Sequence, residues 1–302
     1  MSWVSVHVFS QGPLDHMITE LAGPLLGDDG FFLRYWEGGP HLRIRVKSHP
    51  AEHVVARAEA YLREHPSEAV IDPEEYARLA ATLAAREGLS GHTGRLYPND
   101  SVHLIPYRPE HHRYGTGRSL DAAERHFHES SRIALELIRS GLPPARRGAA
   151  WLTMLLVAWQ VAGEGRMFAP PPGAPVDAPY DEATRARLAA LAAHARTVTA
   201  QPPPSEPSGV VATWYASIAR LAGELAAAGF DARRTGETVD LAAHLLANRL
   251  GIRVQEEARL RHLATGAVRE PEVSAERAPF GYGRQPEASA GLPGHEPEVS
   301  VG

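Results

Sequence analysis

Residues 31–46, FFLRYWEGGPHLRIRV, decide the fold of the first third of this chain. They predict two strands joined by a turn, because Gly-Gly-Pro at 38–40 separates two runs of apolar and aromatic residues. Side chains along a strand point alternately to opposite faces. The second strand therefore has an apolar face and a polar face, formed by Leu42, Ile44 and Val46 and by His41, Arg43 and Arg45.

The arginine pair predicts an anion lying across this sheet. Two cations on one strand face repel each other unless a negative group lies between them, and a guanidinium has the donor geometry that a carboxylate fits. The alternative is a solvated surface, since only Lys47 is lysine among 31 basic residues and the composition is arginine-rich throughout. Because Arg43 and Arg45 form a pair that follows an aromatic strand, the case for an anion-binding site, with a carboxylate as the ligand, is stronger than for a single arginine, and both interpretations stay open.

The composition is that of a soluble globular protein. Of the 302 residues, 43% are hydrophobic and 22% are charged, and the formal net charge of -5 disfavours a protein that binds nucleic acid directly. The absence of cysteine excludes disulfides and thiol chemistry. The longest apolar run, 149–162, predicts a buried helix. No signal peptide or membrane-length segment is recognised, so we expect a cytoplasmic protein with no membrane partner.

The fold class predicted from the whole chain is α+β, with mixed strands and helices first and a largely helical C-terminal portion. We expect one domain over 1–268 and a disordered tail over 269–302, where Pro, Glu, Gly and Ser replace periodic apolar residues. The expected strands and extended segments are 3–10, 31–36, 41–46, 89–98 and 101–107. The expected helices are 13–26, 50–64, 72–87, 121–141, 145–163, 181–199, 210–228 and 237–265.

Two further motifs contain titratable side chains. The segment 105–115, IPYRPEHHRYG, follows a predicted strand, although Glu110 and Arg113 have the spacing of a simple helical ion pair. The segment 241–252, LAAHLLANRLGI, predicts a buried helix on which His244 needs a hydrogen-bond partner. The paired histidines near residues 111 and 126 lack the spacing of a metal signature, so we predict neither a metal site nor a cofactor.

Taken in order, these motifs resemble the C-terminal elimination domain of class I lanthipeptide dehydratases, in the stand-alone form of thiopeptide-type bacteriocin biosynthesis. The resemblance covers about residues 1–265 and departs from the family pattern at Thr116 and Ser130. It rests on Arg34-Tyr35 with His41-Leu42-Arg43-Ile44-Arg45, on Tyr107-Arg108-Pro109-Glu110 with Arg113-Tyr114-Gly115, on the 124–131 helix, and on His244 with Asn248-Arg249-Leu250-Gly251.

The resemblance implies a lyase that removes glutamate from glutamylated Ser or Thr of a precursor peptide, leaving dehydroalanine or dehydrobutyrine. It implies catalytic roles for Arg43, Arg45, Arg113 and His244. The arginines would interact with the glutamyl group and the enolate, and the histidine would transfer a proton. The implied partners are the leader-core precursor peptide and a separate glutamylation enzyme that uses glutamyl-tRNA; a homodimer is compatible with the resemblance.

Two alternatives stay open. Pyridine synthases of thiopeptide pathways have the same fold but join two dehydroalanines in a formal [4+2] cycloaddition with release of the leader. They have no glutamyl group to hold, and this chain keeps all four elimination residues, so elimination is favoured. The third reading is a non-catalytic subunit that binds the precursor peptide.

Overall fold

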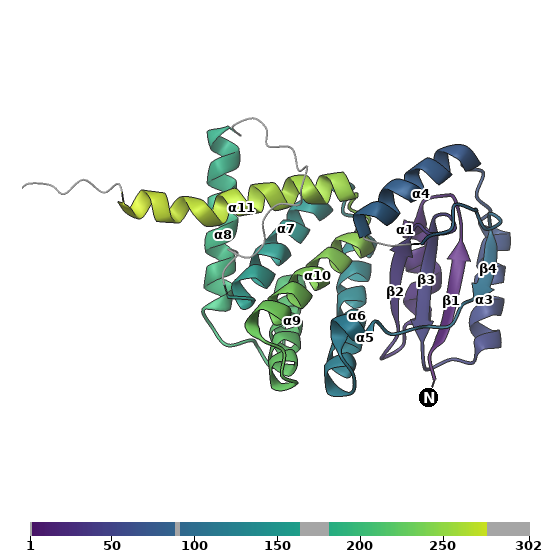
Figure 1. Cartoon of the computed structure of the whole chain (residues 1–302), viewed down its shortest axis with the longest axis horizontal. Helices are drawn as coiled ribbons and strands as arrows, with labels where there is room; N and C mark the ends of the chain where they lie inside the picture. Colours follow the sequence, from purple (N-terminus) through teal and green to yellow (C-terminus); the bar gives the residue numbers. More distant parts are fainter. Residues whose placement is uncertain (1, 88–90, 164–180, 277–302) are drawn as a thin grey trace, which may run out of the picture. The chain divides into compact units, whose positions relative to one another are not determined.

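The computed structural model describes residues 2–87, 91–163 and 181–276 (Figure 1). The chain divides into two units, Met1–Val268 and Arg269–Gly302, and the first unit contains the sheet and most of the helices. The strands are β1 (Val4–Phe9), β2 (Phe31–Tyr35), β3 (His41–Val46) and β4 (Ser101–Leu104). The helices are α1 (Leu14–Met17), the π-helical turn η1 (Ile18–Ala22), α2 (Gly23–Leu25), α3 (Ala51–Glu64), α4 (Pro73–Glu87), α5 (His111–Tyr114), α6 (Arg118–Arg139), α7 (Pro144–Val161), α8 (Glu182–Thr199), α9 (Val210–Ala227), α10 (Ala232–Leu250) and α11 (Val254–Glu276).

The sheet is antiparallel and has the strand order β2-β3-β1-β4. The predicted hairpin is present, and its turn requires glycine because Gly38 and Gly39 have φ angles of 84° and 113°. The Tyr76 hydroxyl of α4 accepts hydrogen bonds from both glycine N–H groups, at 2.6 and 3.1 Å. Helix α4 therefore fixes the turn that sets the pairing of β2 with β3.

The apolar face of the sheet forms part of the core. Val6, Val8, Leu42, Ile44 and Val46 are each 0% exposed. Helix α3 packs against β1 and β4, and its own buried residues repeat every four positions, at Val54, Ala58 and Leu62. Burying one such aliphatic side chain contributes roughly 1.5–3 kcal/mol. The alternation along residues 41–46 thus commits one face of the sheet to the core and leaves the other for polar groups.

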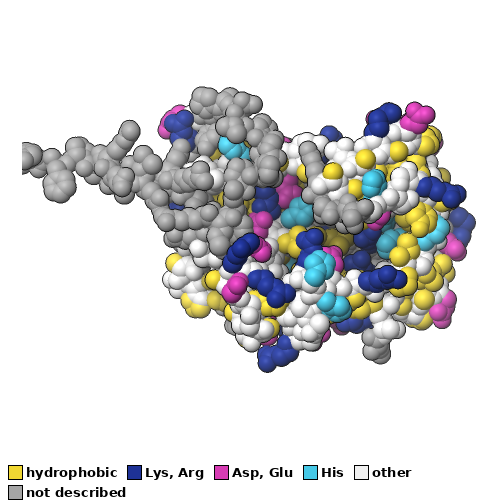
Figure 2. Space-filling view, viewed as in Figure 1, with side chains coloured by type: hydrophobic (Ala, Val, Ile, Leu, Met, Phe, Trp, Pro, Cys, Tyr) yellow, Lys and Arg dark blue, Asp and Glu magenta, His cyan; other side chains and the backbone are white. Residues whose placement is uncertain are grey.

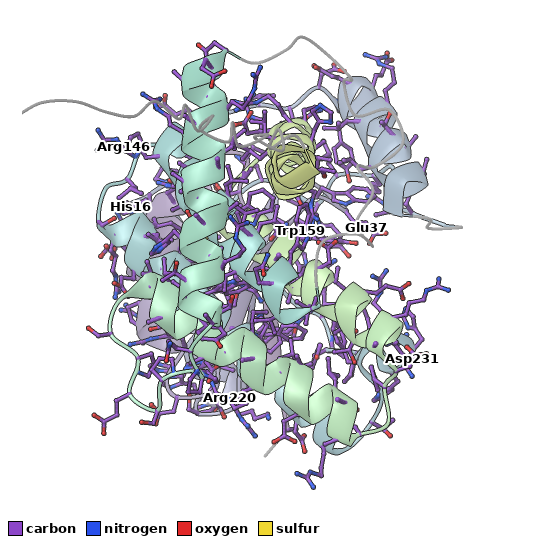
Figure 3. The ribbon with its side chains drawn as sticks, turned by 90° about the vertical axis from the view of Figure 1, so that its left-hand side faces the viewer. His16, Glu37, Arg146, Trp159, Arg220 and Asp231 are labelled. Carbon is purple, nitrogen blue, oxygen red and sulfur yellow. The ribbon has the colours of Figure 1, made fainter. Side chains whose placement is uncertain are left out.

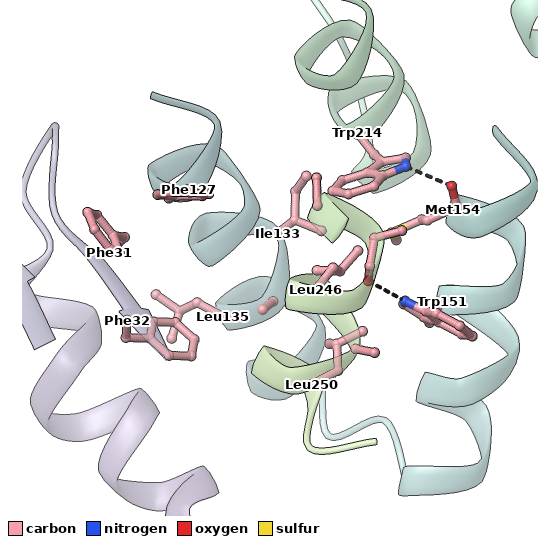
Figure 4. Close-up of a cluster of buried hydrophobic side chains, with 14 of the residues drawn as sticks. Phe31, Phe32, Phe127, Ile133, Leu135, Trp151, Met154, Trp214, Leu246 and Leu250 are labelled. Carbon is pink, nitrogen blue, oxygen red and sulfur yellow. Dashed lines mark hydrogen bonds between the residues drawn. The ribbon is translucent and has the colours of Figure 1, made fainter. Parts of the chain in front are cut away.

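A second part of the core lies among α6, α7, α9 and α10, which pack against one another. Two buried tryptophans connect these helices (Figure 4): the Trp214 indole N–H donates to the Met154 carbonyl, and that of Trp151 donates to the Ala243 carbonyl, each at 2.8 Å. Each indole fills the space between helices and satisfies its only donor.

The end of α10 closes the open edge of β2. The Asn248 side-chain amide accepts from the Arg34 N–H at 3.1 Å and donates to the Arg34 carbonyl at 2.9 Å, as a neighbouring strand would. Arg249, fully buried, donates to the Phe32 carbonyl at 3.0 Å. The motif at the end of α10 therefore joins the helical part of the unit to the sheet.

The structure differs from the sequence expectations in three details. The helix expected over 237–265 is two helices, because Gly251 adopts a left-handed conformation (φ 74°) that ends α10. Residues 91–98 form no strand, and β4 ends at Leu104. Residues 269–276, assigned to the tail, belong to α11; residues 277–302 lie outside the described part. No helix among the described residues is long and apolar enough to cross a membrane.

Candidate functional site

The polar face of the sheet carries aromatic, histidine and arginine side chains in register. On β3, residues 41, 43 and 45 lie directly opposite residues 9, 7 and 5 of β1. The predicted juxtaposition of Arg43 and Arg45 on one face, opposite the apolar face, is therefore correct. The side chains that share this face on β1, β3 and β2 are, in that order, Ser5, His7 and Phe9; His41, Arg43 and Arg45; and Tyr35, Leu33 and Phe31.

Tyr35 and His41 hold Arg43 in place. Its guanidinium carbon lies 3.3 Å from the centroid of the Tyr35 ring, and its Nε donates to Nε2 of His41 at 3.2 Å. His41 must then donate from Nδ1, and that nitrogen lies 2.8 Å from the Gly39 carbonyl. Burial, with help from the charges of Arg43 and Arg45, lowers the pKa of His41 to about 3, so the ring is neutral. The turn glycine thereby orients a histidine that orients the arginine.

Arg45 lies between aromatic rings and forms no salt bridge with any described residue. Its guanidinium carbon lies 4.4 Å from the Tyr107 centroid and 5.4 Å from that of Phe31. Burial and the charge of Arg43 lower the pKa of Arg45 to about 10, although the carboxylates of Glu110 and Glu124 act in the opposite direction. A partly buried cation with no ion-pair partner indicates a site that attracts an anion.

His7 completes the polar face. Its ring stacks on that of His41 with centroids 4.9 Å apart, and it is 5% exposed. Burial and the neighbouring Arg43 lower its pKa to about 2. This side chain thus adds hydrogen-bonding atoms beside the arginines without adding charge.

Arg113 comes from α5 and lines a cleft of about 440 Å³ between α5 and the first half of α10. Its Nε lies 2.7 Å from a Glu110 carboxylate oxygen, so the simple ion pair considered from the spacing is present. The same Glu110 carboxylate acts electrostatically on Arg45. The other residues that line the cleft are His112, Asp231, Arg233, Arg234, Glu237, Thr238 and Leu241. Basic, acidic and histidine side chains gather in the middle of the face shown in Figure 2.

His244 lies on α10 one turn beyond Leu241, a residue of this cleft. Its hydrogen-bonded and charged neighbours are on α10 and α11 rather than on the sheet. Nδ1 lies 2.8 Å from a carboxylate oxygen of Glu257, whose other oxygen lies 2.8 Å from Nε of Arg261. Burial alone would lower the pKa of His244, but the hydrogen bond and charge of Glu257 outweigh it and raise the pKa.

The network behind His244 continues to α7. Arg261 binds Asp240 at 2.6 Å, and the Trp159 indole N–H donates to the same carboxylate at 3.0 Å. In Figure 3, where α11 is seen nearly end-on, Trp159 lies close to α11 and Asp231 lies at the far end of α10. Glu257, itself held by this network, thus fixes His244 through Nδ1, and no described residue forms a hydrogen bond with the second ring nitrogen of His244.

Sequence reasoning missed two acids of this site. Glu110 was considered only as a partner of Arg113, and Glu257 was not considered, because the helix break that brings it beside His244 was not predicted. Gly251, which follows the last apolar residue of α10, was the sequence signal that could have predicted this helix end. Among the described residues no group of His, Asp or Glu has the arrangement of a metal site.

The model of the family described as "Lantibiotic biosynthesis dehydratase C-term" matches residues 3–268. The chain belongs to this family. The resemblance drawn from the motifs is therefore confirmed, and members of the family are enzymes that act on precursor peptides in the maturation of ribosomally made peptides. No curated protein sequence matches this lantibiotic dehydratase C-terminal chain.

Three solved structures share the fold. The pyridine synthase TbtD from thiomuracin biosynthesis is 21% identical, with a TM-score of 0.68, over 89% of this chain and 98% of that one. The tRNA-dependent lantibiotic dehydratase MibB from Microbispora sp. 107891 is 19% identical, with a TM-score of 0.57, over 92% of this chain and 29% of that one. TsrL is 16% identical, with a TM-score of 0.58, over 90% and 95%. At these identities the likeness shows a common fold and leaves the reaction open.

Proposed function

We propose that this family member eliminates glutamate from glutamylated Ser or Thr side chains of a precursor peptide. A base takes the proton from the α-carbon, and the electron pair of that C–H bond forms the double bond to the β-carbon. The β-carbon–oxygen bond breaks, and glutamate leaves with its carboxylate restored. The reaction needs a base, stabilisation of the enolate and a receptor for the glutamyl group.

The observation that carries the proposal is the pair of guanidinium groups, of Arg43 and Arg45, on the polar face of the sheet. Arg43 is oriented by Tyr35 and His41, and Arg45 has no salt bridge with a described residue. An anionic transition state and an anionic leaving group both gain from such preorganised donors. We assign Arg43 and Arg45 to the enolate and the glutamyl group. Arg113 is assigned to the same anions because its partner Glu110 also acts electrostatically on Arg45.

Proton transfer is assigned to His244. Its side chain is 43% exposed, so a substrate can reach it, while Glu257 is 7% exposed and holds Nδ1. With Nδ1–H donated to Glu257, Nε2 carries the lone pair that a base needs. The opposing charges of Glu257 and Arg261 allow this histidine to take a proton in one step and to return it in another.

The test uses a glutamylated precursor made by a separate glutamylation enzyme with glutamyl-tRNA. Mass spectrometry of the peptide follows the loss of glutamate with time. We expect Arg43→Ala to slow elimination by roughly 10²–10³-fold, the range for loss of one transition-state donor, and the glutamylated peptide to accumulate. Arg57→Ala, which removes an exposed arginine of α3, is the matched control and should retain full activity. Complete dehydration of the peptide by Arg43→Ala would show that the pair of Arg43 and Arg45 is not part of the mechanism.

The same experiment separates the two alternatives. Wild-type protein is also incubated with a fully dehydrated precursor. A macrocycle with a new six-membered nitrogen ring and a released leader means a pyridine synthase, and peptide that binds but is unchanged by either incubation means a binding subunit. Elimination predicts glutamate release in the first incubation and no cyclisation in the second.

A further inference from the structure

Two buried hydrogen-bond donors on the polar face of the sheet have no acceptor among the described residues. They are the Ser5 hydroxyl and the Nε of Arg45. Ser5 lies directly opposite Arg45 across β1 and β3 and is 4% exposed. Nearly all buried donors in proteins have a partner, so two neighbouring ones without a partner indicate an acceptor that lies outside the described residues, and a bound ligand can supply it.

The register brings these two donors close together. The Ile105 N–H donates to the Ser5 carbonyl, so the main-chain groups of Ser5 face β4 rather than β3. Ser5 and Arg45 therefore form a non-hydrogen-bonded pair of the β1–β3 ladder, in which side chains approach most closely. A hydroxyl and a guanidinium N–H at this spacing can each donate to one of the two oxygens of a carboxylate.

The surrounding charges favour an anion over a neutral acceptor. Arg43 is two residues from Arg45 on the same face, and the neighbouring His7 is neutral because burial and Arg43 lower its pKa to about 2. The nearby carboxylates have other partners. Glu110 binds Arg113 at 2.7 Å, while Glu124 accepts from the Trp3 indole at 3.1 Å and lies 3.5 Å from Lys47.

Aromatic rings form the walls around this position. Tyr107 stacks on the Arg45 guanidinium and meets Trp3 edge-on with centroids 5.6 Å apart. Phe31 packs edge-on against Trp3 at 5.1 Å. A carboxylate bound here is shielded from water, which strengthens its interaction with the two donors. Tyr107 follows β4 in a segment without regular structure, and it covers the guanidinium.

We propose that Ser5 and Arg45 form a subsite for the side-chain carboxylate of glutamate, with Ser5 as a substrate-binding residue. The choice of glutamate rests on the proposed function. A glutamyl group joined through its main-chain carboxyl, as in glutamyl-tRNA, keeps its side-chain carboxylate. That group is therefore present both in the glutamylated peptide and in the released product. A glutaminyl analogue has no charge at this point.

The first test is calorimetric titration of the full-length protein with free L-glutamate and, separately, with L-glutamine. We expect wild type to bind glutamate and not glutamine. Ser5→Ala should bind glutamate about tenfold more weakly, as expected for loss of one hydrogen bond to a charged group. Ser5→Thr keeps the hydroxyl and suits a strand, so it should restore binding. The matched control is Ser101→Ala on β4, whose hydroxyl already donates to the Pro98 carbonyl at 2.6 Å; it should bind glutamate as wild type does.

The second test measures elimination with glutamylated precursor. Ser5→Ala should raise KM with little change in kcat, because the carboxylate is held equally before and during the reaction. Equal glutamate binding by wild type and Ser5→Ala, or no binding by wild type, would mean that the two donors hold only a buried water, and would overturn the subsite. Ser5-dependent glutamate binding in a protein that releases no glutamate from the peptide would refute elimination and leave the subsite standing.

Discussion

Replacing Glu257 with Gln tests how His244 is held. The substitution keeps the size of the side chain and removes its charge. The Glu257 carboxylate accepts from both His244 and Arg261, at 2.8 Å each. A Gln side chain has one oxygen, and its NH₂ group would face a donor on one of these two partners. The variant therefore loses one charge-assisted hydrogen bond and places two donors together.

The expected loss of stability is about 2 kcal/mol. Breaking a buried ion pair typically costs about 3–5 kcal/mol, because it leaves a charge without a partner. Here Arg261 keeps Asp240 at 2.6 Å, and the His244 side chain is 43% exposed, so both remaining groups are partly satisfied. For a domain of this size, about 2 kcal/mol corresponds to a fall in Tm of roughly 4–8 °C.

The difference between wild type and variant should depend on pH. Burial alone would raise the pKa of Glu257, but His244 and Arg261 lower it, so its contribution to stability is lost as pH falls through the lowered pKa. The pKa of His244 is raised, so its contribution is complete below about 6.5, the unfolded value, and is lost as pH rises through the folded value. The difference is therefore largest between about pH 5 and 6.5, and it declines as pH rises to the folded pKa of His244.

Urea unfolding at several pH values measures the loss, and an NMR titration of the His244 ring should show its pKa fall in Glu257→Gln. The matched control is Glu256→Gln, the adjacent residue, whose pair with Arg259 has side chains 42% and 55% exposed. We expect this control to change stability by less than about 0.5 kcal/mol. If the two variants are equally stable, or if the His244 pKa stays at its wild-type value, the assigned network is wrong.

Two further predictions concern the fold that supports the site. Asn248→Ala leaves the N–H and carbonyl of Arg34 at the edge of β2 without the side-chain amide that they bind. We expect urea unfolding to show a free energy of unfolding lower by about 2 kcal/mol. Stability equal to that of wild type would show that water replaces the amide at no cost. His126 is fully buried, and burial lowers its pKa to about 3, so the unfolded chain binds a proton below about pH 6.5 that the folded chain does not. This residue should reduce stability by about 1.4 kcal/mol for each pH unit below that value, and His126→Gln should remove that slope between pH 6 and 4; an unchanged slope would contradict its burial as a neutral ring.

The sequence by itself determined the local structure around the arginines. Alternation along residues 41–46 fixed which side chains share a face, because a strand has a period of two whatever it pairs with. The glycines at 38 and 39 fixed the turn, since only glycine readily adopts their positive φ angles. Four short motifs in order were enough to indicate the family, and the family model bears this out. The placement of Arg43 and Arg45 on one face of the sheet therefore follows from local sequence alone.

Only the tertiary structure decided what surrounds them. Strand β1 lies between β3 and β4, and this order places Ser5 and His7 beside the arginines. The order depends on contacts between residues about 40 positions apart, and no local period in the sequence encodes such pairing. His244 shows the same limit from the other side. The sequence predicted that His244 lies on a helix. Its partner Glu257, however, lies beyond the end of that helix at Gly251, where the turn directs α11 back across α10. Local periodicity fixes the face a side chain occupies, whereas long-range packing fixes the group that it meets.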